Sequence, residues 1–306
     1  MLSRRRFGLA WLMAVVLVAM ALAGCALLTP RQAASERGFA EVNGTRLYYE
    51  VAGSGEAVVL LHGLGGDTRG WDYNFGEFAR HYRTIRYDMR GYGQSGAPEQ
   101  PYTHEDDLKA LLDYLGISRA HIVGQSFGGE QGLNFVLAYP DRVLSFVSVA
   151  GGIAGAEGLP DSPPEDAEAY AAMGAALQSG DLDGAAKAIL DLKMFQVVRK
   201  DSKLSAELVR IFADYFTRHG TDTNTLLPAQ VPAAKRLGEV KAPSIYIVGD
   251  HDIEQNQRLA DLFVAGIPRA RKVVMSGCDH LSFLTKPKKF NQIVLRFLAE
   301  NASVAQ

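Results

Sequence analysis

The chain has 306 residues, of which 47% are hydrophobic and 22% are charged, and this composition is ordinary for a globular protein. Its length accommodates one α/β domain with a large core and an inserted segment. The formal net charge of −2 argues against a nucleic-acid partner, because proteins that bind nucleic acid usually present a basic surface.

The N-terminus has the three parts of an export signal. Arg4-Arg5-Arg6 precede an apolar run from Phe7 to Gly24, and small residues stand directly before Cys25. A basic segment, an apolar segment and a small-residue cleavage site predict a signal peptide over residues 1–24. The order Leu22-Ala23-Gly24-Cys25 is similar to the bacterial lipobox, whose cysteine takes a diacylglyceryl group and becomes the mature N-terminus.

This resemblance implies an exported bacterial lipoprotein that is anchored in a membrane through lipidated Cys25 and faces the periplasm or the cell exterior. Two alternatives concern the same segment. Ser3 to Phe7 also resembles a twin-arginine export signal, and the run from Phe7 to Leu28 is long enough to serve as an uncleaved transmembrane anchor. Residues 25–38 are expected to form a polar tether.

After the tether, the pattern changes to alternating strands and helices. Asn43-Gly44 lies between two alternating segments within residues 39–51, which predicts a hairpin with a type I′ turn. Strand and helix patterns then alternate from Val58 to Val149. This alternation predicts a parallel sheet with helices on both faces. The first three helices are expected near residues 71–82, 103–115 and 127–139.

The strand over residues 57–61 runs into a glycine-rich turn, His62-Gly63-Leu64-Gly65-Gly66. Glycines allow backbone N–H groups to face a developing oxyanion, so the N–H of Leu64 is a candidate oxyanion donor. We interpret His62 as a structural histidine that fixes this turn, and a catalytic role for it is the alternative.

Ser126 stands in Gly124-Gln125-Ser126-Phe127-Gly128, between a short buried strand and a helix that Pro140 ends. A serine on a strand-to-helix turn, with a glycine two residues away on each side, is the nucleophile-elbow pattern. The tight turn strains the serine backbone and presents its hydroxyl at the sheet edge. The helix N-terminus favours negative charge there, and the N–H of Phe127 is the second candidate oxyanion donor.

Between residues 151 and 241 the alternation stops, and alanine-rich segments with a helical period replace it. Some of their apolar side chains are candidates to line a substrate pocket, although most are expected only to pack the helices onto the sheet. The helical segments lie near residues 165–178, 182–195 and 202–218, and the candidate lining residues are Met194, Phe195, Val197, Phe212, Tyr215 and Phe216.

An acid and a histidine follow Ser126 in the order that an elbow serine requires. The strand 244–248 runs into Gly249-Asp250-His251-Asp252, and either aspartate could orient an imidazole. His280 stands in a polar turn after the strand 271–275 and before the last helix, residues 287–300. From that turn its ring can reach over the C-terminal edge of the sheet.

The remaining histidines and cysteines have plainer explanations. His219 lies in a charged helical stretch and is expected at the surface. Cys278 is expected to be a small packing residue, since a serine already occupies the elbow. A metal site built from residues 250–252 and Asp279 lacks helical ligand spacing. Catalysis by an activated serine needs neither a metal nor an organic cofactor, so we expect none.

Together these segments resemble the α/β-hydrolase fold family of esterases, lipases and carbon–carbon bond hydrolases. The matching pieces follow the order of that family: residues 62–66, Asp88-Met89-Arg90-Gly91-Tyr92-Gly93-Gln94-Ser95, residues 124–129, residues 249–252 and Asp279-His280. The resemblance implies a mostly parallel central sheet with helices on both faces and a helical lid, residues 151–241, inserted after the sixth strand. The α/β core would then comprise residues 39–150 and 242–306.

The resemblance also assigns roles. In the family the acid usually stands three residues after the glycine that ends its strand, which favours Asp252 over Asp250. Ser126 would attack a carbonyl, His280 would move the proton, and Asp252 would orient His280. The backbone N–H groups of Leu64 and Phe127 would hold the oxyanion, and residues 88–95 would be a structural loop.

The implied activity is that of a serine hydrolase that cleaves a carboxylic ester or a related acyl bond of a small molecule through an acyl-enzyme. Carbon–carbon bond hydrolase, lactonase and perhydrolase chemistry on the same fold are alternatives. An alternative of another class is a non-catalytic surface lipoprotein that binds a lipid or a partner. The sequence leaves the oligomeric state open.

Overall fold

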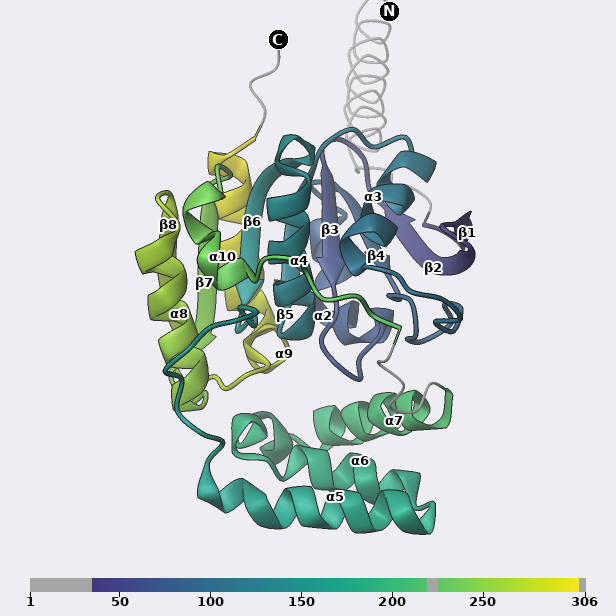
Figure 1. Ribbon diagram of the computed structural model, residues 1–306, viewed down its shortest axis with the longest axis vertical. Coiled ribbons are helices and arrows are strands. Elements are labelled where there is room, and N and C mark those ends of the chain that lie inside the picture. The colour runs from purple at the N-terminus through teal and green to yellow at the C-terminus, as the bar shows by residue number, and fades with distance from the viewer. Residues whose placement is uncertain (1–34, 219–224, 303–306) are drawn as a thin grey trace, which may run out of the picture. The chain divides into compact units, whose positions relative to one another are not determined.

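One eight-stranded sheet, in the order β1-β2-β4-β3-β5-β6-β7-β8, organises the fold (Figure 1). Strand β2 runs antiparallel to β1 and β4, and all other neighbours are parallel. The mostly parallel sheet that the sequence predicts is therefore confirmed. The strands are β1 Glu36–Val42, β2 Thr45–Ala52, β3 Ala57–Leu61, β4 Arg83–Tyr87, β5 Ala120–Gln125, β6 Val143–Val149, β7 Ser244–Gly249 and β8 Ala270–Met275.

The structure, a computed structural model, describes residues 35–218 and 225–302. The expected signal peptide, the lipidation site at Cys25 and His219 lie outside these residues. Within the described ranges, every helix is too short or too polar to cross a membrane.

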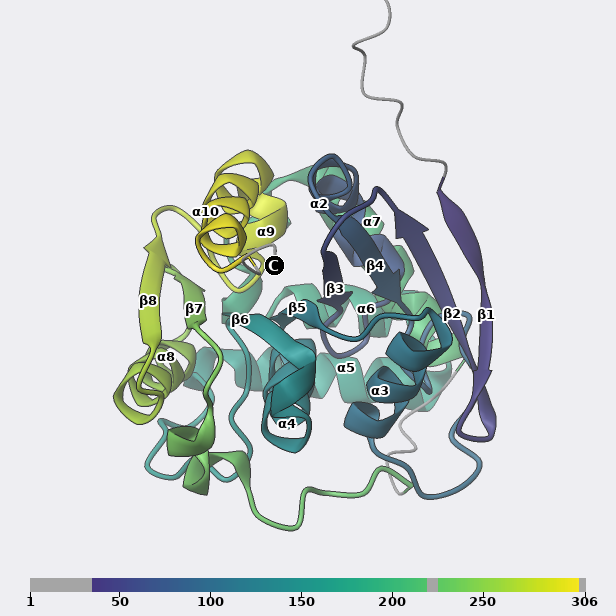
Figure 2. The ribbon, with the colours of Figure 1, turned by 90° about the horizontal axis from the view of Figure 1, so that it is seen from above.

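Helices cover both faces of the sheet. In Figure 2, α2, α9 and α10 lie on one face, and α3, α4 and α8 lie on the other. The central strands β3, β5, β6 and β7 are buried along their whole length, as expected for parallel strands that are covered on both sides. The helices are α2 Asp72–Phe78, α3 His104–Tyr114, α4 Phe127–Ala138, α8 Glu254–Gly266, α9 Ser282–Thr285 and α10 Pro287–Glu300.

In the described part of the segment between β6 and β7, three helices gather beyond one end of the sheet (Figure 1): α5 Ala167–Ser179, α6 Leu182–Leu190 and α7 Ser202–Arg218. The second helix is shorter than the sequence predicts, because α6 stops at Leu190 and a separate 3₁₀ turn follows over Lys193–Phe195. There the Lys193 N–H donates to the Asp166 carboxylate at 2.7 Å instead of continuing the helix.

The first strand begins three residues before the predicted boundary between tether and core. Glu36 already pairs with Val51, and its carboxylate accepts a hydrogen bond from the Tyr49 hydroxyl at 3.0 Å. These residues look like a tether because β1 is a solvent-exposed edge strand, which tolerates polar side chains. The turn after β1 has positive φ at Asn43 (48°) and Gly44 (70°), as a type I′ turn requires.

Candidate active site

Ser126 forms the tight turn between β5 and α4 that the sequence predicts. Its φ of 52° and ψ of −116° are strained for a residue with a side chain. A Cβ on Gly124 would lie 2.1 Å from the Gly128 carbonyl oxygen, and one on Gly128 would lie 2.4 Å from the His62 carbonyl oxygen. The two glycines therefore let the strand, the helix and the neighbouring turn approach closely enough to form the elbow.

The glycine-rich turn after β3 lies beside this elbow and is fixed by His62. Its Nδ1–H donates to the Gly63 carbonyl at 2.9 Å, and its Nε2 accepts the Met89 N–H at 3.0 Å. These two partners fix the tautomer, and burial lowers the pKa of His62, so the ring stays neutral. His62 thus joins the turn to the loop after β4, and this arrangement matches the structural role expected for it.

The two candidate oxyanion donors lie on either side of Ser126. Phe127 is the first residue of α4, so its N–H has no acceptor within the helix. Among the described residues, neither its N–H nor that of Leu64 has a hydrogen-bond acceptor. A Cβ on Gly63 would lie 3.4 Å from Ser126 Cβ, which places the Leu64 turn directly against the serine.

The structure separates the two candidate acids. Asp252 is buried and its Oδ2 lies 3.3 Å from His280 Nδ1. Asp250 instead accepts hydrogen bonds from the backbone of Gly277, at 2.6 Å, and contacts His251 Nδ1 at 2.7 Å. The hydrogen bond with His251 lowers the pKa of Asp250 to about 2. Asp250 therefore stabilises the loop that carries His280. Of the two aspartates, only Asp252 contacts the imidazole of His280.

The loop that carries His280 is held by residues from the helical insertion. The His280 N–H donates to the Met194 carbonyl at 3.2 Å. The neighbouring Asp279 is fully buried, and its Oδ2 accepts the N–H groups of Val197 and Val198, both at 2.8 Å. This role of Asp279 is not predicted from the sequence. Its position beside the histidine was the available signal, but its partners lie about eighty residues away in the chain.

Ser126 and His280 line one cavity of about 410 Å³. Most of its wall is apolar, and the helical insertion supplies a large part of it. Two lining residues, Leu64 and Tyr170, are 58% and 42% exposed, so they mark where the cavity opens to solvent. Most of the six candidate residues of the insertion were expected only to pack the helices onto the sheet, and that expectation is wrong. Val197 does not line the cavity, but the other five do: Met194, Phe195, Phe212, Tyr215 and Phe216.

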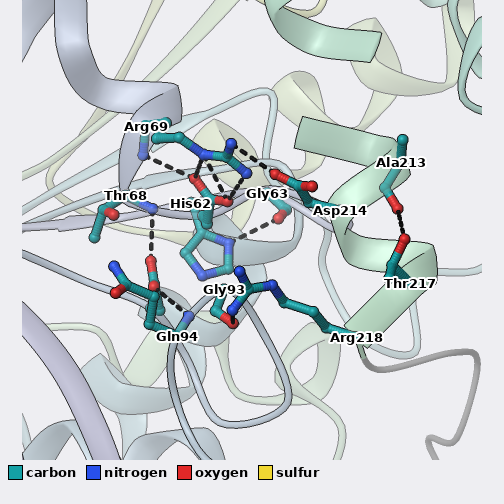
Figure 3. Close-up of polar contacts among 12 residues, drawn as sticks. His62, Gly63, Thr68, Arg69, Gly93, Gln94, Ala213, Asp214, Thr217 and Arg218 are labelled. Atoms are coloured by element: carbon teal, nitrogen blue, oxygen red, sulfur yellow. Dashed lines mark hydrogen bonds and ion pairs between the residues drawn. The ribbon is translucent and has the colours of Figure 1, made fainter. Parts of the chain in front are cut away.

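Ion pairs connect the segment after the glycine-rich turn to α7 (Figure 3). Arg69 lies between Asp67, at 2.6 Å, and Asp214 of α7, at 2.8 Å. Asp67 lines the cavity, and among its described lining residues there is neither lysine nor arginine. Further along α7, Arg218 Nη1 lies 3.5 Å from the Gly93 carbonyl oxygen. These contacts attach α7 to the core beside the active site.

The remaining candidates have structural positions. Burial raises the pKa of Cys278 to about 11, which leaves the thiol protonated and poorly reactive near neutral pH. In the described part of the chain, no three His, Cys, Asp or Glu side chains are grouped so that they could hold a metal ion. Asn256, which the sequence analysis did not consider, contacts both Asp252 and His280.

Comparison with known proteins agrees with the fold. The family described as the alpha/beta hydrolase fold matches residues 56–287. A 2-hydroxy-6-oxononadienedioate/2-hydroxy-6-oxononatrienedioate hydrolase of Paraburkholderia phymatum is 32% identical over 271 residues, which cover 83% of this chain and 91% of that protein. A 2-hydroxy-6-oxo-6-phenylhexa-2,4-dienoate hydrolase of Comamonas testosteroni is 31% identical, with the same coverage of each chain.

A solved structure is also similar. Est816, described as an N-acyl homoserine lactone degrading enzyme, superposes with a TM-score of 0.68 at 26% identity, over 85% of this chain and all of that one. The family match extends over most of the chain, and the relatives are named hydrolases. The chain therefore belongs to the alpha/beta hydrolase family and is a hydrolytic enzyme.

Proposed function

We propose that the protein is a serine hydrolase that cleaves esters whose acyl group is uncharged and apolar. The observation that carries this proposal is the shared cavity. Ser126 and His280 both line it beside the glycine-rich turn, and its described lining residues include neither lysine nor arginine.

In the proposed mechanism, Ser126 Oγ attacks the ester carbonyl while His280 Nε2 takes its proton. The tetrahedral oxyanion accepts hydrogen bonds from the N–H groups of Leu64 and Phe127. His280 then gives the proton to the alcohol that leaves, and an acyl group remains on Ser126. Water, deprotonated by His280, hydrolyses this acyl-enzyme and restores the serine. Asp252 orients the imidazole and stabilises its charged form.

The residues that line the cavity favour a substrate whose acyl group is uncharged. The substrates named for the two relatives are a dienedioate and a dienoate, which carry carboxylates. Burying a carboxylate without a cationic partner costs several kcal/mol. Asp67, the acidic residue of the wall, would add repulsion, although its pairing with Arg69 limits that effect.

The size of the cavity limits the acyl group to a short or medium length. A volume of about 410 Å³ is near the lower end for ligand pockets, roughly 300–1,000 Å³. If each non-hydrogen atom occupies about as much space as a water molecule, ~30 Å³, the cavity holds on the order of ten such atoms. Esters of this size fit within it, and longer chains would have to extend past Leu64 and Tyr170 into solvent.

Carbon–carbon bond hydrolysis is the second candidate, and the names of the relatives favour it. Two kinds of substrate separate the candidates: p-nitrophenyl esters of graded acyl length, and a 2-hydroxy-6-oxo-dienoate whose chromophore is lost on cleavage. We expect kcat/KM to be higher for the neutral esters and to peak at a short or medium acyl length. A clear preference for the dienoate would replace the ester proposal with carbon–carbon bond hydrolysis.

The Ser126→Ala variant provides the mechanistic control. Removal of a triad nucleophile should lower kcat by about three or more orders of magnitude. The hydroxyl is not part of the apolar core, so the thermal unfolding midpoint should stay close to that of the wild type. Ester turnover near the wild-type rate in this variant would show that another group performs the chemistry.

A further inference from the structure

The side chain of Asn256, in the first turn of α8, touches two members of the proposed triad. Its Nδ2 lies 2.8 Å from Asp252 Oδ1 and 3.0 Å from His280 Nδ1, and the residue is only 6% exposed. A carboxylate can only accept hydrogen bonds. The amide atom beside Asp252 must therefore be the nitrogen, so chemistry fixes the orientation of this amide group.

The same amide nitrogen also constrains the imidazole. One of its two hydrogens bonds to Asp252, and the other can point to His280 Nδ1. A bare Nδ1 accepts this hydrogen, whereas a protonated Nδ1 would face a second donor at 3.0 Å. The contact therefore stabilises the neutral ring that carries its proton on Nε2, and it opposes the imidazolium that forms when Ser126 loses its proton.

The hydrogen bonds that Asp252 accepts also disfavour the imidazolium form of His280. Its Oδ1 accepts both the Ile253 N–H and Asn256 Nδ2, each at 2.8 Å, while Oδ2 faces His280 at 3.3 Å. Two donors on Oδ1 hold the carboxylate in place and stabilise its charge. The carboxylate consequently attracts the imidazolium less strongly than it would without Asn256.

Other charged or titratable groups near the ring have partners elsewhere. Tyr246 of β7 donates its hydroxyl hydrogen to the Gly151 carbonyl at 2.8 Å. Asp279 turns to backbone N–H groups of the helical insertion, and His251 contacts Asp250. The insertion itself places the apolar ring of Phe195 beside the imidazole in a T-shaped arrangement, with ring centres 6.0 Å apart.

We propose that Asn256 is a positioning residue: it holds Asp252 and favours the neutral form of His280 with its proton on Nε2, so that the triad remains active at a lower pH. The inference rests on the proposed serine-hydrolase function. The same contact disfavours the tautomer with Nδ1–H, which the ring must adopt before Nε2 can accept the serine proton. Asn256 therefore widens the working pH range at some cost in catalytic rate.

The kinetic test compares Asn256→Leu with Gln257→Leu in the full chain, using kcat/KM for a neutral p-nitrophenyl ester between pH 5 and 9. The control makes the same amide-to-alkyl change one residue away, where the Gln257 side chain donates to the Gly249 carbonyl, at 2.6 Å. In Asn256→Leu, loss of the hydrogen bond to His280 should increase the affinity of the imidazole for a proton by about three- to tenfold. The midpoint of the acid limb should accordingly rise in Asn256→Leu and stay unchanged in Gln257→Leu.

An unchanged or lowered midpoint in Asn256→Leu would overturn the proposal, even if kcat falls, because a merely structural role changes the rate without moving the midpoint. If Gln257→Leu raises the midpoint equally, the effect belongs to the helix and not to Asn256, and the proposal is again wrong.

A second measurement needs no substrate and leaves Asn256 in place. ¹⁵N NMR of the wild type at pH 8, with the His280 signal identified by its loss in His280→Gln, reports which ring nitrogen carries the proton. We expect Nε2–H, and a protonated Nδ1 would contradict the inference. Nε2–H in a protein that hydrolyses no ester would instead show that the proposed function fails while the Asn256 contact stands.

Discussion

His104, the first residue of α3, gives a stability prediction that follows directly from its surroundings. The side chain is 2% exposed and lies against the rings of Tyr102 and Phe127, with ring centres 5.1 and 5.4 Å away. Neither ring nitrogen has a hydrogen-bond partner among the described residues. Burial, followed by the proximity of His62 and Arg90, lowers the pKa of His104 to about 3.

The sign and size of the effect follow from proton linkage. In the unfolded chain a histidine titrates with a pKa of about 6.5. Between that pKa and the folded value of about 3, the unfolded state binds a proton that the folded state does not. The contribution of His104 to the free energy of unfolding is therefore greatest above pH 6.5, and it decreases as the pH falls. At pH 5 the loss is about 2 kcal/mol, since each pKa unit corresponds to about 1.4 kcal/mol.

The assay is urea unfolding of the wild type and of His104→Phe at pH 7.5 and pH 5.0. Phenylalanine keeps the aromatic packing and cannot be protonated, so the variant should lose about 2 kcal/mol less than the wild type between these pH values. The other histidines are the same in both proteins, so their contribution cancels in the comparison. His81→Phe, the same change at an exposed histidine, serves as the control and should behave like the wild type. Equal losses in His104→Phe and the wild type would refute the reasoning.

Three further predictions concern the triad, the cavity and the N-terminus. Asp252→Asn should lower kcat by at least about a hundredfold, while Asp250→Asn stays within about tenfold of the wild type; the reverse order would assign the acid to Asp250. Phe212→Leu should enlarge the cavity and raise the kcat/KM ratio of longer to shorter esters by about tenfold, and an unchanged ratio would place the acyl chain elsewhere. Mass spectrometry should find a diacylated Cys25 at the mature N-terminus and an unprocessed precursor in Cys25→Ala, whereas an unmodified Met1 in the wild type would indicate a transmembrane anchor.

The sequence is most informative where backbone geometry and residue type are closely linked. Only glycine fits at positions 124 and 128, so the elbow at Ser126 could be located before the structure was known. The same holds for Asn43-Gly44, whose positive φ angles suit few other residues. The sheet follows from the alternation of strands and helices, because each element must bury an apolar face.

The rest depends on contacts between segments far apart in the chain. Asn256 is an ordinary polar residue near a helix start, and only the fold shows that its amide reaches His280. Likewise, Asp279 pairs with the insertion across 81 and 82 positions, and no local pattern encodes that separation. The start of β1 was misplaced for a related reason, since an exposed edge strand and a polar tether have the same composition.

The most direct test of the central claim is labelling of the intact protein with a fluorophosphonate probe, which reacts only with an activated serine. The account predicts stoichiometric labelling that mass spectrometry maps to Ser126 and that is absent in Ser126→Ala. Labelling should also fall strongly in His280→Gln, because the hydroxyl then has no base. A folded wild-type protein that remains unlabelled would contradict the account and would favour a surface lipoprotein that binds its ligand without turnover.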